Sequence, residues 1–444
     1  MVVSRKYIGL SLPIQLRTTI MKLFFVFLFL LLKWSPAVGE KTAPFCSCDA
    51  PPNMRLSQAY TAFQAWKDVM TCDPQNITSD WVGTNVCDYT GVYCAPAPDD
   101  PNVLTVAGID LNYAGICGIL PEKLGLLSDL ALIHLNSNRF TGKLPSSLNG
   151  KYLYEFDASN NEFSGEFPVD VLSLPSLRYF DIRFNKFTGK IPASLFDRNL
   201  DAIFINDNRF TGPIPANLGK SSASVVVIAD LKLSGCIPTS IGDMSSNLDE
   251  IVLLNNGLTG CIPPEVGSLD SVTVFDVGRN KLSGPLPAKI IGMSSLEVLN
   301  VASNQLSGVI PDGLCRLPNL KNFTFQDNFF TVEPPSCVAL PAKNATGNCI
   351  LGSPLQKITA LCSSFQSKPV RCEQRGSCVV PVPMPFKPPP CSGSGSGWGS
   401  GSGWDAGGGG GGGGGSSCIG QGSGSGQGSG GGVGFGIGIG GGGG

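Results

Sequence analysis

The stretch LIHLNSNRFTGKLP, residues 132–145, contains a phrase that this chain repeats over most of its length. It returns, aligned residue for residue, as EFDASNNEFSGEFP (155–168), YFDIRFNKFTGKIP (179–192) and AIFINDNRFTGPIP (202–215). Every copy has an Asn that is followed four residues later by Gly and seven residues later by Pro. This regular spacing predicts a chain built from equivalent structural units.

The Asn of this phrase marks ten units along the chain. Eight units have Asn at the marker position: Asn138, Asn161, Asn185, Asn208, Asn256, Asn280, Asn304 and Asn328. The other two carry Ala114 and Leu231 there, and successive markers lie 23 to 25 residues apart. Residues eight, five and three positions before each marker are apolar, as Leu130, Ile133 and Leu135 are.

This pattern is that of a leucine-rich repeat, in which one unit forms one coil of a solenoid. The apolar residues before the marker predict a short strand that faces the core, and stacked strands form a parallel sheet. The marker Asn is expected to bond backbone groups at the turn, Gly permits the next bend, and Pro lies where no ladder N–H is needed. One coil cannot bury its own leucines, but ten stacked coils can.

The predicted fold is therefore an α/β-type solenoid, a horseshoe of about ten coils with cysteine-containing caps. The phrases FTGxIP and LSGxIP are typical of the plant extracellular class of leucine-rich repeats. Formal net charge is only −2, so bulk charge gives no attraction to nucleic acid. His134 is the single histidine and no GxSxG sequence occurs. We expect a protein that is not an enzyme and holds no cofactor or metal, with His134 as a solvated surface residue.

The amino terminus predicts export. The apolar run LFFVFLFLLL (23–32) follows Lys22 and precedes small residues, which is typical of a signal peptide over residues 1–39. Ten apolar residues are too few to span a bilayer, so no membrane insertion is expected. An exported chain folds where cysteines pair. Three N-x-[ST] sequons predict glycosylation at Asn76, Asn322 and Asn344.

Two segments that flank the repeats resemble the caps of the leucine-rich repeat extensins of plant cell walls. LSQAYTAFQAWKDVMTCDPQNITSDWVGTNVCDYTGVYC (56–94) looks like the amino cap of that family, and LQKITALCSSFQSKPVRC (355–372) looks like its carboxyl cap. The expected segments are an amino segment and cap at 40–102, repeats at 103–335, a carboxyl cap at 336–378, and a Pro-containing linker with a disordered Gly/Ser-rich tail at 379–444. The family's Ser-Pro extensin blocks are absent from this tail.

The resemblance implies a secreted wall protein that binds small basic, cysteine-containing peptides of the rapid alkalinisation factor class. A polygalacturonase-inhibitor-like protein uses the same repeat and remains an alternative. So does a purely structural wall protein in which the Gly-rich tail provides the function.

Disulfides are expected between cysteines at matched or nearby positions. We predict Cys87–Cys94 around a tight turn, and Cys236–Cys261 at equivalent positions of adjacent coils, which lie roughly 5 Å apart. Cys315–Cys337 is expected to close the last coil. The sequence assigns no partners to seven others: Cys46, Cys48, Cys72, Cys117, Cys349, Cys362 and Cys372. An inter-chain bond, and with it a homodimer, therefore remains open.

Outward positions of the strands predict a ligand site on the concave face. These positions are rich in acids, and apolar residues follow on three successive strands in the middle. The predicted ligand-binding residues are Asp157, Asp181, Phe204, Val227, Val252 and Asp276. One residue after the marker the charge reverses, which suggests contact between this flank and anionic pectin.

Overall fold

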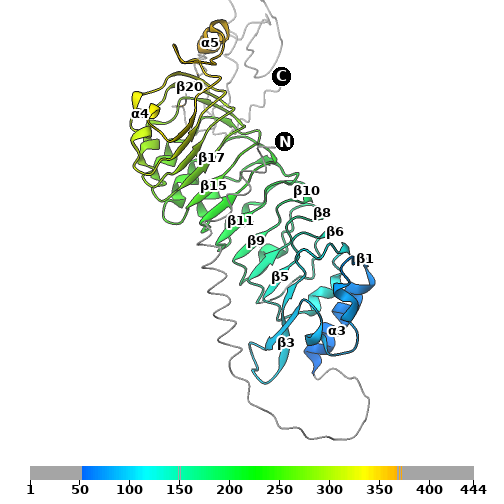
Figure 1. Cartoon of the computed structure of the whole chain (residues 1–444). Coiled ribbons are helices and arrows are strands. Elements are labelled where there is room, and N and C mark those ends of the chain that lie inside the picture. Colours follow the sequence, from blue (N-terminus) through cyan, green and yellow to red (C-terminus); the bar gives the residue numbers. More distant parts are fainter. Residues whose placement is uncertain (1–52, 149, 151, 368–369, 371, 373–444) are drawn as a thin grey trace, which may run out of the picture. The chain divides into compact units, whose positions relative to one another are not determined.

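A computed structural model describes residues 53–148, 150, 152–367, 370 and 372 (Figure 1). The predicted signal peptide at 1–39, Cys46, Cys48 and the predicted tail at 379–444 lie outside the described residues.

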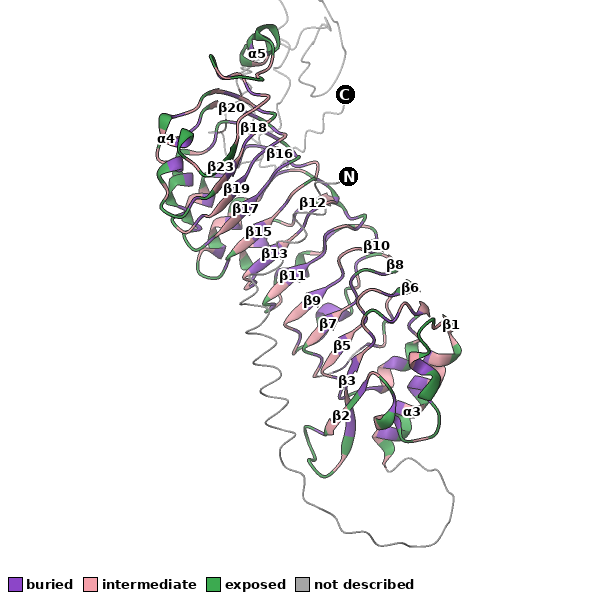
Figure 2. Ribbon diagram, viewed as in Figure 1, coloured by how far each residue is buried: buried purple, intermediate pink, exposed green. Residues whose placement is uncertain are grey.

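The repeats form a solenoid whose first strands build a 12-stranded sheet. Its ten middle strands correspond to the ten predicted coils: β3 (Leu104–Asp110), β5 (Leu132–His134), β7 (Glu155–Asp157), β9 (Tyr179–Asp181), β11 (Ala202–Phe204), β13 (Val225–Val227), β15 (Glu250–Val252), β17 (Val274–Asp276), β19 (Val298–Asn300) and β21 (Asn322–Thr324). Neighbouring coils are parallel and in register, so that Phe156 lies between Ile133 and Phe180. The middle residue of the three-residue strands is buried, and its two neighbours face away from the core (Figure 2).

A second set of strands follows each marker. These strands are β4 (Cys117–Gly118), β6 (Arg139–Gly142), β8 (Glu162–Gly165), β10 (Lys186–Phe187), β12 (Thr211–Pro213), β14 (Lys232–Ser234), β16 (Thr259–Gly260), β18 (Lys281–Gly284), β20 (Gln305–Val309) and β22 (Phe329–Val332). The repeat's Gly has a left-handed φ at the bend after them, for example 80° at Gly142.

Short 3-10 helices complete the coils. They are η3 (Glu122–Leu126), η4 (Val171–Ser173), η5 (Ala193–Leu195), η6 (Leu218–Lys220), η7 (Thr239–Met244), η8 (Pro264–Ser268), η9 (Ala288–Gly292) and η10 (Leu314–Arg316). Most begin directly after the repeat's Pro, which supplies the extended residue before the turn, as Pro192 does for η5.

The marker Asn residues join neighbouring coils through backbone hydrogen bonds. Asn161 Nδ2 donates to the carbonyl of Ala158 in its own coil and to that of Leu135 in the coil before. Its Oδ1 accepts from the N–H of Phe140, also in the preceding coil. This confirms the predicted ladder, and it explains why the position tolerates so little variation: a buried turn has no water to satisfy these groups.

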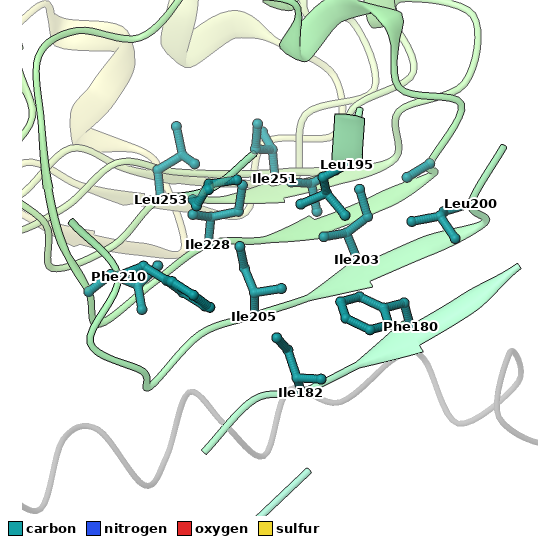
Figure 3. Packing of buried hydrophobic residues seen from close by; sticks show 14 of the residues in the cluster. Phe180, Ile182, Leu195, Leu200, Ile203, Ile205, Phe210, Ile228, Ile251 and Leu253 are labelled. Carbon is teal, nitrogen blue, oxygen red and sulfur yellow. The ribbon is translucent and has the colours of Figure 1, made fainter. Parts of the chain in front are cut away.

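Apolar side chains from both strands fill the space between the sheets (Figure 3). Phe140, Phe163, Phe187 and Phe210 stack in successive coils with ring centroids 6.1 to 6.4 Å apart. Trp66 of the amino cap lies on the end of this column, 5.8 Å from Phe140. The column therefore continues into the cap, which covers the apolar end of the first coils.

The amino cap consists of α3 (Met54–Asp68), β1 (Met70–Cys72), η1 (Ile77–Asp80), η2 (Val86–Asp88) and β2 (Val92–Pro96). Asn53 caps α3 by accepting from the N–H of Leu56. The predicted Cys87–Cys94 bond is present, and Cys117 pairs with Cys72, so that one disulfide joins cap and first coil.

The carboxyl cap contains a short eleventh coil that the sequence reading missed. Strand β23 (Ala342–Asn344) adds to the long sheet, and Asn348 occupies the marker position. Asn348 accepts from the N–H of Phe330 and donates to Phe325, as a ladder Asn does. It follows Asn328 by only 20 residues, which is why the regular period did not reveal it. Helices α4 (Pro335–Val338) and α5 (Thr359–Gln366) complete the cap.

The predicted Cys236–Cys261 bond is wrong. Cys261 pairs instead with Cys372, 111 residues further along the chain, at a Cα–Cα distance of 5.9 Å. Cys236 is also disulfide-bonded, to a cysteine other than Cys261. The prediction considered only neighbouring coils, whereas the segment after α5 returns along the solenoid and brings Cys372 against Gly284 and Cys261. Cys315–Cys337 is present as predicted, and Cys349 pairs with Cys362.

Candidate functional site

The outward side of the long sheet is the concave face, and the six predicted ligand residues all lie on it. Asp157, Val227 and Val252 are half-buried there. Asp181, Phe204 and Asp276 are buried, with exposures of 0%, 4% and 6%. The expectation that all six are exposed is therefore wrong for these three, because residues on the same and neighbouring strands cover them.

Asp181 belongs to a polar and aromatic cluster rather than to an open surface. Arg183 Nε lies 3.0 Å from its carboxylate, and the Tyr179 hydroxyl lies 3.3 Å away. The Arg183 guanidinium in turn lies over the ring of Phe204, 4.8 Å from its centroid. Burial raises the pKa of the Asp181 carboxyl, while Arg183 opposes that rise. Asp181 therefore orients Arg183 and does not offer a free negative charge.

His134 is not the solvated residue that the sequence predicted. Its ring lies between two strands, with Nδ1 3.8 Å from Asp110 and Nε2 3.1 Å from Glu155. Burial lowers the pKa of His134, but these two carboxylates raise it, to about 10. At neutral pH the imidazolium thus neutralises part of the acidity of the first coils.

Asp207 and Asp230 are neighbouring acids of the middle coils. No cation lies within 4 Å of either carboxylate in the described part of the chain, and each accepts from an asparagine, Asn206 for Asp207 and Asn255 for Asp230. The pKa of Asp207 is raised to about 6, mainly by burial; the hydrogen bond from Asn206 opposes the rise and the nearby Asp230 contributes to it. Both residues have left-handed backbone, but the equivalent positions hold Phe184 and Arg279, so the turn does not require an acid. Neither acid is among the six residues that the sequence predicted for the ligand site.

Half-buried apolar side chains lie between the acids of the middle coils. Val227 and Val252 pair directly across strands β13 and β15, and Leu254 follows Val252. Asp276, on the next strand, accepts from the N–H of Gly278 and from Asn300, and burial raises its pKa to about 6. The centre of the face is thus an apolar strip bordered by carboxylates.

Two of the three predicted glycosylation sites lie at the carboxyl end of the same face. Asn322 is on β21 and Asn344 on β23, both half-buried, and Asn344 is bonded to Gln326. Asn76 lies in the amino cap and is exposed.

Among the described residues, no three His, Cys, Asp or Glu side chains are grouped so that they could hold a metal ion. The described helices are also too short or too polar to cross a membrane.

These features define a leucine-rich repeat solenoid with an acidic, partly apolar concave face. The leucine-rich repeat N-terminal domain model matches residues 56–95, and the leucine-rich repeat model matches residues 176–197 and 295–317. Leucine-rich repeat extensin-like protein 7 of Arabidopsis thaliana is 51% identical over 322 residues, which are 72% of this chain and 74% of that protein. Protein 6 of the same series and organism is 52% identical over 358 residues, 79% of this chain and 76% of that protein. The chain belongs to the leucine-rich repeat extensin-like proteins.

The Arabidopsis receptor kinase HAESA is a structural neighbour, solved in complex with the peptide hormone IDA and the co-receptor SERK1. It is 26% identical, with a TM-score of 0.52 over 66% of this chain and 54% of that chain.

Proposed function

We propose that this chain is a secreted cell-wall protein whose concave face binds a small basic, cysteine-containing peptide of the rapid alkalinisation factor class. Export by the segment 1–39, the segment boundaries given above and glycosylation at the three sequons are parts of the same proposal. The observation that carries it is the pair Asp207 and Asp230 beside the apolar strip of Val227 and Val252.

A cationic ligand would relieve an unfavourable arrangement at this place. The Asp207 carboxylate is partly withdrawn from water and lies near a second acid, Asp230, so a Lys or Arg side chain between them would stabilise the charged form of Asp207. The adjacent apolar strip would bury its surface against an apolar side chain of the same peptide. A basic peptide with apolar residues therefore matches both features at once.

The neighbouring coils of the concave face support a peptide site in the middle coils. In the earlier coils Asp181 is paired with Arg183, and His134 neutralises part of the charge of Asp110 and Glu155. Glycans at Asn322 and Asn344 would crowd the carboxyl end of the sheet. The middle coils are left as the part of the face with free acids, and the peptide hormone bound by the neighbour HAESA offers a precedent for a peptide ligand on this fold.

The test is binding of a synthetic basic peptide of that class to the full-length protein. Asp207→Asn with Asp230→Asn should weaken binding mainly through slower association, since charge steers encounter. Val227→Glu should accelerate dissociation, because it places an unpaired charge in the desolvated contact. Asp157→Asn and Val252→Glu, further along the face, should have smaller effects of the same kinds.

Matched controls lie away from the concave face. Asp270→Asn removes an exposed carboxylate and Val169→Glu adds a charge at an exposed valine, and neither should change binding. If Asp207→Asn with Asp230→Asn and Val227→Glu both bind as the unaltered protein does, the concave site is excluded. Capture of a pectin-degrading hydrolase instead of the peptide would favour the inhibitor alternative, and binding of neither would favour a structural wall protein.

A further inference from the structure

The flank of the solenoid carries a surface that the peptide site does not use. On the second strands, the residue two positions after the marker points inward, as Phe210 and Leu233 do. The residues one and three positions after it therefore point outward. Half of the first row is cationic, and the second is a continuous row of Ser and Thr from Thr141 to Thr331.

The cations cluster on coils two to six. Arg139, Arg209 and Lys232 are exposed at the first outward position, and Lys186 is half-buried there. Lys143 and Lys190 add two exposed ammonium groups next to the bend. We call these six residues the basic strip.

Most of this charge is uncompensated. Two acids share the strip, Glu162 and Glu166, and Glu162 pairs with Lys186 at 2.6 Å. Within the described part of the chain, the other cations of the strip form no ion pair within 4 Å. The stem of Lys190 lies across Gly212 of the next coil, and that of Lys143 lies across Gly165, so glycine gives each stem a surface to lie on.

Cations and hydroxyls also alternate in a regular order. Lys232 pairs in register with Thr211 of the preceding coil, and Lys186 pairs with Ser164. The hydroxyls of Thr188 and Thr211 donate to carbonyls of the coil before, which leaves their lone pairs free to accept. Four of the five coils thus offer a cation beside a hydroxyl acceptor, at the strand spacing of about 4.8 Å, whereas coil three carries Glu162 and Glu166 beside Ser164.

Toward the carboxyl end of the solenoid, this surface ends where Val370 and Cys372 lie on it. Cys372 and Val370 lie against Gly284, over coils seven and eight, where the Cys261–Cys372 bond holds them. Coil six is also tied by a disulfide, at Cys236, so the part of the strip without such a bond among the described residues lies on coils two to five.

We propose that the basic strip binds an extended, carboxylated polysaccharide, a polyuronate, that runs along the solenoid axis. A repeating ligand with one carboxylate and several hydroxyls per sugar matches a surface with a hydroxyl on every coil from two to six and a cation on four of these five coils. The outward positions of the strip hold no aromatic ring on which nucleobases could stack, and no large apolar side chain to enter a bilayer. Charge and hydroxyl chemistry together therefore favour a sugar acid over other polyanions.

The experiment measures binding of the full-length protein to oligogalacturonates and to the same oligomers after methyl esterification. The unesterified oligomers should bind with an affinity that falls steeply as ionic strength rises. Esterified oligomers should bind much more weakly, since their carboxylates are gone. Arg209→Glu with Lys232→Glu should weaken binding about tenfold or more at low salt.

Lys289→Glu is the matched control, because Lys289 is an exposed lysine on η9, away from the strip. It should leave oligogalacturonate binding unchanged, and the strip variant should leave binding of the basic peptide unchanged. Equal binding of esterified and unesterified oligomers would overturn the proposal, and so would full affinity in the strip variant. Single-stranded DNA or anionic vesicles that bind as tightly as the oligogalacturonate would show a general polyanion surface and would also overturn it.

Discussion

Replacing one ladder asparagine should reveal how strongly the coils are coupled. Asn280 is 8% exposed and its side chain makes four hydrogen bonds. Two of them cross to the preceding coil: Oδ1 accepts from the N–H of Leu258 at 3.0 Å, and Nδ2 donates to the carbonyl of Leu253 at 3.0 Å. In Asn280→Ala the N–H of Leu258 remains buried without this partner, and the carbonyl of Leu253 keeps only the hydrogen bond from Asn256 Nδ2.

The expected cost follows from those two groups. An unsatisfied buried polar group costs roughly 1–3 kcal/mol, so Asn280→Ala, which leaves the Leu258 N–H unsatisfied and weakens the bonding of Leu253, should lower the free energy of unfolding by about 2 to 3 kcal/mol. Asn280→Leu fills the volume again, as Leu231 does naturally in the sixth coil, but restores no hydrogen bond. It should therefore remain destabilised by most of the same amount.

Chemical denaturation of the disulfide-intact protein measures this cost, and amide hydrogen exchange locates it. The amide of Leu258 should lose protection, while that of Leu306, bonded to Asn328, should keep it. Asn199→Ala is the control, because Asn199 is exposed and should change stability by less than about 0.5 kcal/mol. If Asn280→Ala cost no more than Asn199→Ala, the ladder would not couple the coils, and the reasoning would fail.

Further predictions concern bonds and charges that the structure revealed. Peptide mapping without reduction should recover Cys261 linked to Cys372, and recovery of Cys261 linked to Cys236 would contradict the described path of the carboxyl segment. Burial lowers the pKa of His134 but Asp110 and Glu155 raise it, from 6.5 to about 10. Its contribution is therefore fully present below pH 6.5 and is lost as pH rises through 10. Unfolding free energies of the unaltered protein and of His134→Gln should differ by ~2 kcal/mol at pH 6 and converge toward pH 9.5; a constant difference would show that the ion pairs are not responsible. Trp66→Ala should cost about 3 to 5 kcal/mol, since it opens a cavity at the end of the phenylalanine column, and thermal unfolding measures it.

The sequence predicted those structural features that recur once in every repeat. The strands, the bends, the asparagine ladder and the ten coils follow from residue types at fixed offsets, because each offset has one structural role. The marker role of Asn348 was not predicted because its coil is shortened to 20 residues. The partner of Cys372 was not predicted because a disulfide between residues 111 positions apart leaves no local sequence pattern.

The candidate site was predicted less well, for a related reason. Periodicity shows which side chains point outward, but it does not show what their neighbours do to them. Asp181 and Asp157 occupy equivalent positions, yet only Asp181 has an arginine two residues later that folds back onto it. His134 likewise lies beside carboxylates on both adjacent strands. This arrangement arises only when three coils stack in register.

The peptide proposed for the concave face and the polyuronate proposed for the basic strip are different kinds of ligand. They differ because residue types vary more from coil to coil on the concave face than on the second strands. On the concave face the outward side chains are not restricted to one chemical type: equivalent positions hold His134, Phe204 and Val252, as well as Asp157, which accepts from the N–H of Ser159. Such a sequence of unlike groups can recognise only a ligand that is itself irregular, as a folded peptide is. On the second strands hydroxyls such as those of Thr188 and Thr211 are bonded to the coil before, the hydroxyl row recurs from the second coil to the tenth, and a cation stands beside it in five of these coils. A ligand that gains from this regularity must repeat as the coils do. Exchanging Lys232 with Thr211 would preserve composition and net charge but would break the order of the strip, so it should weaken oligogalacturonate binding and leave peptide binding unchanged.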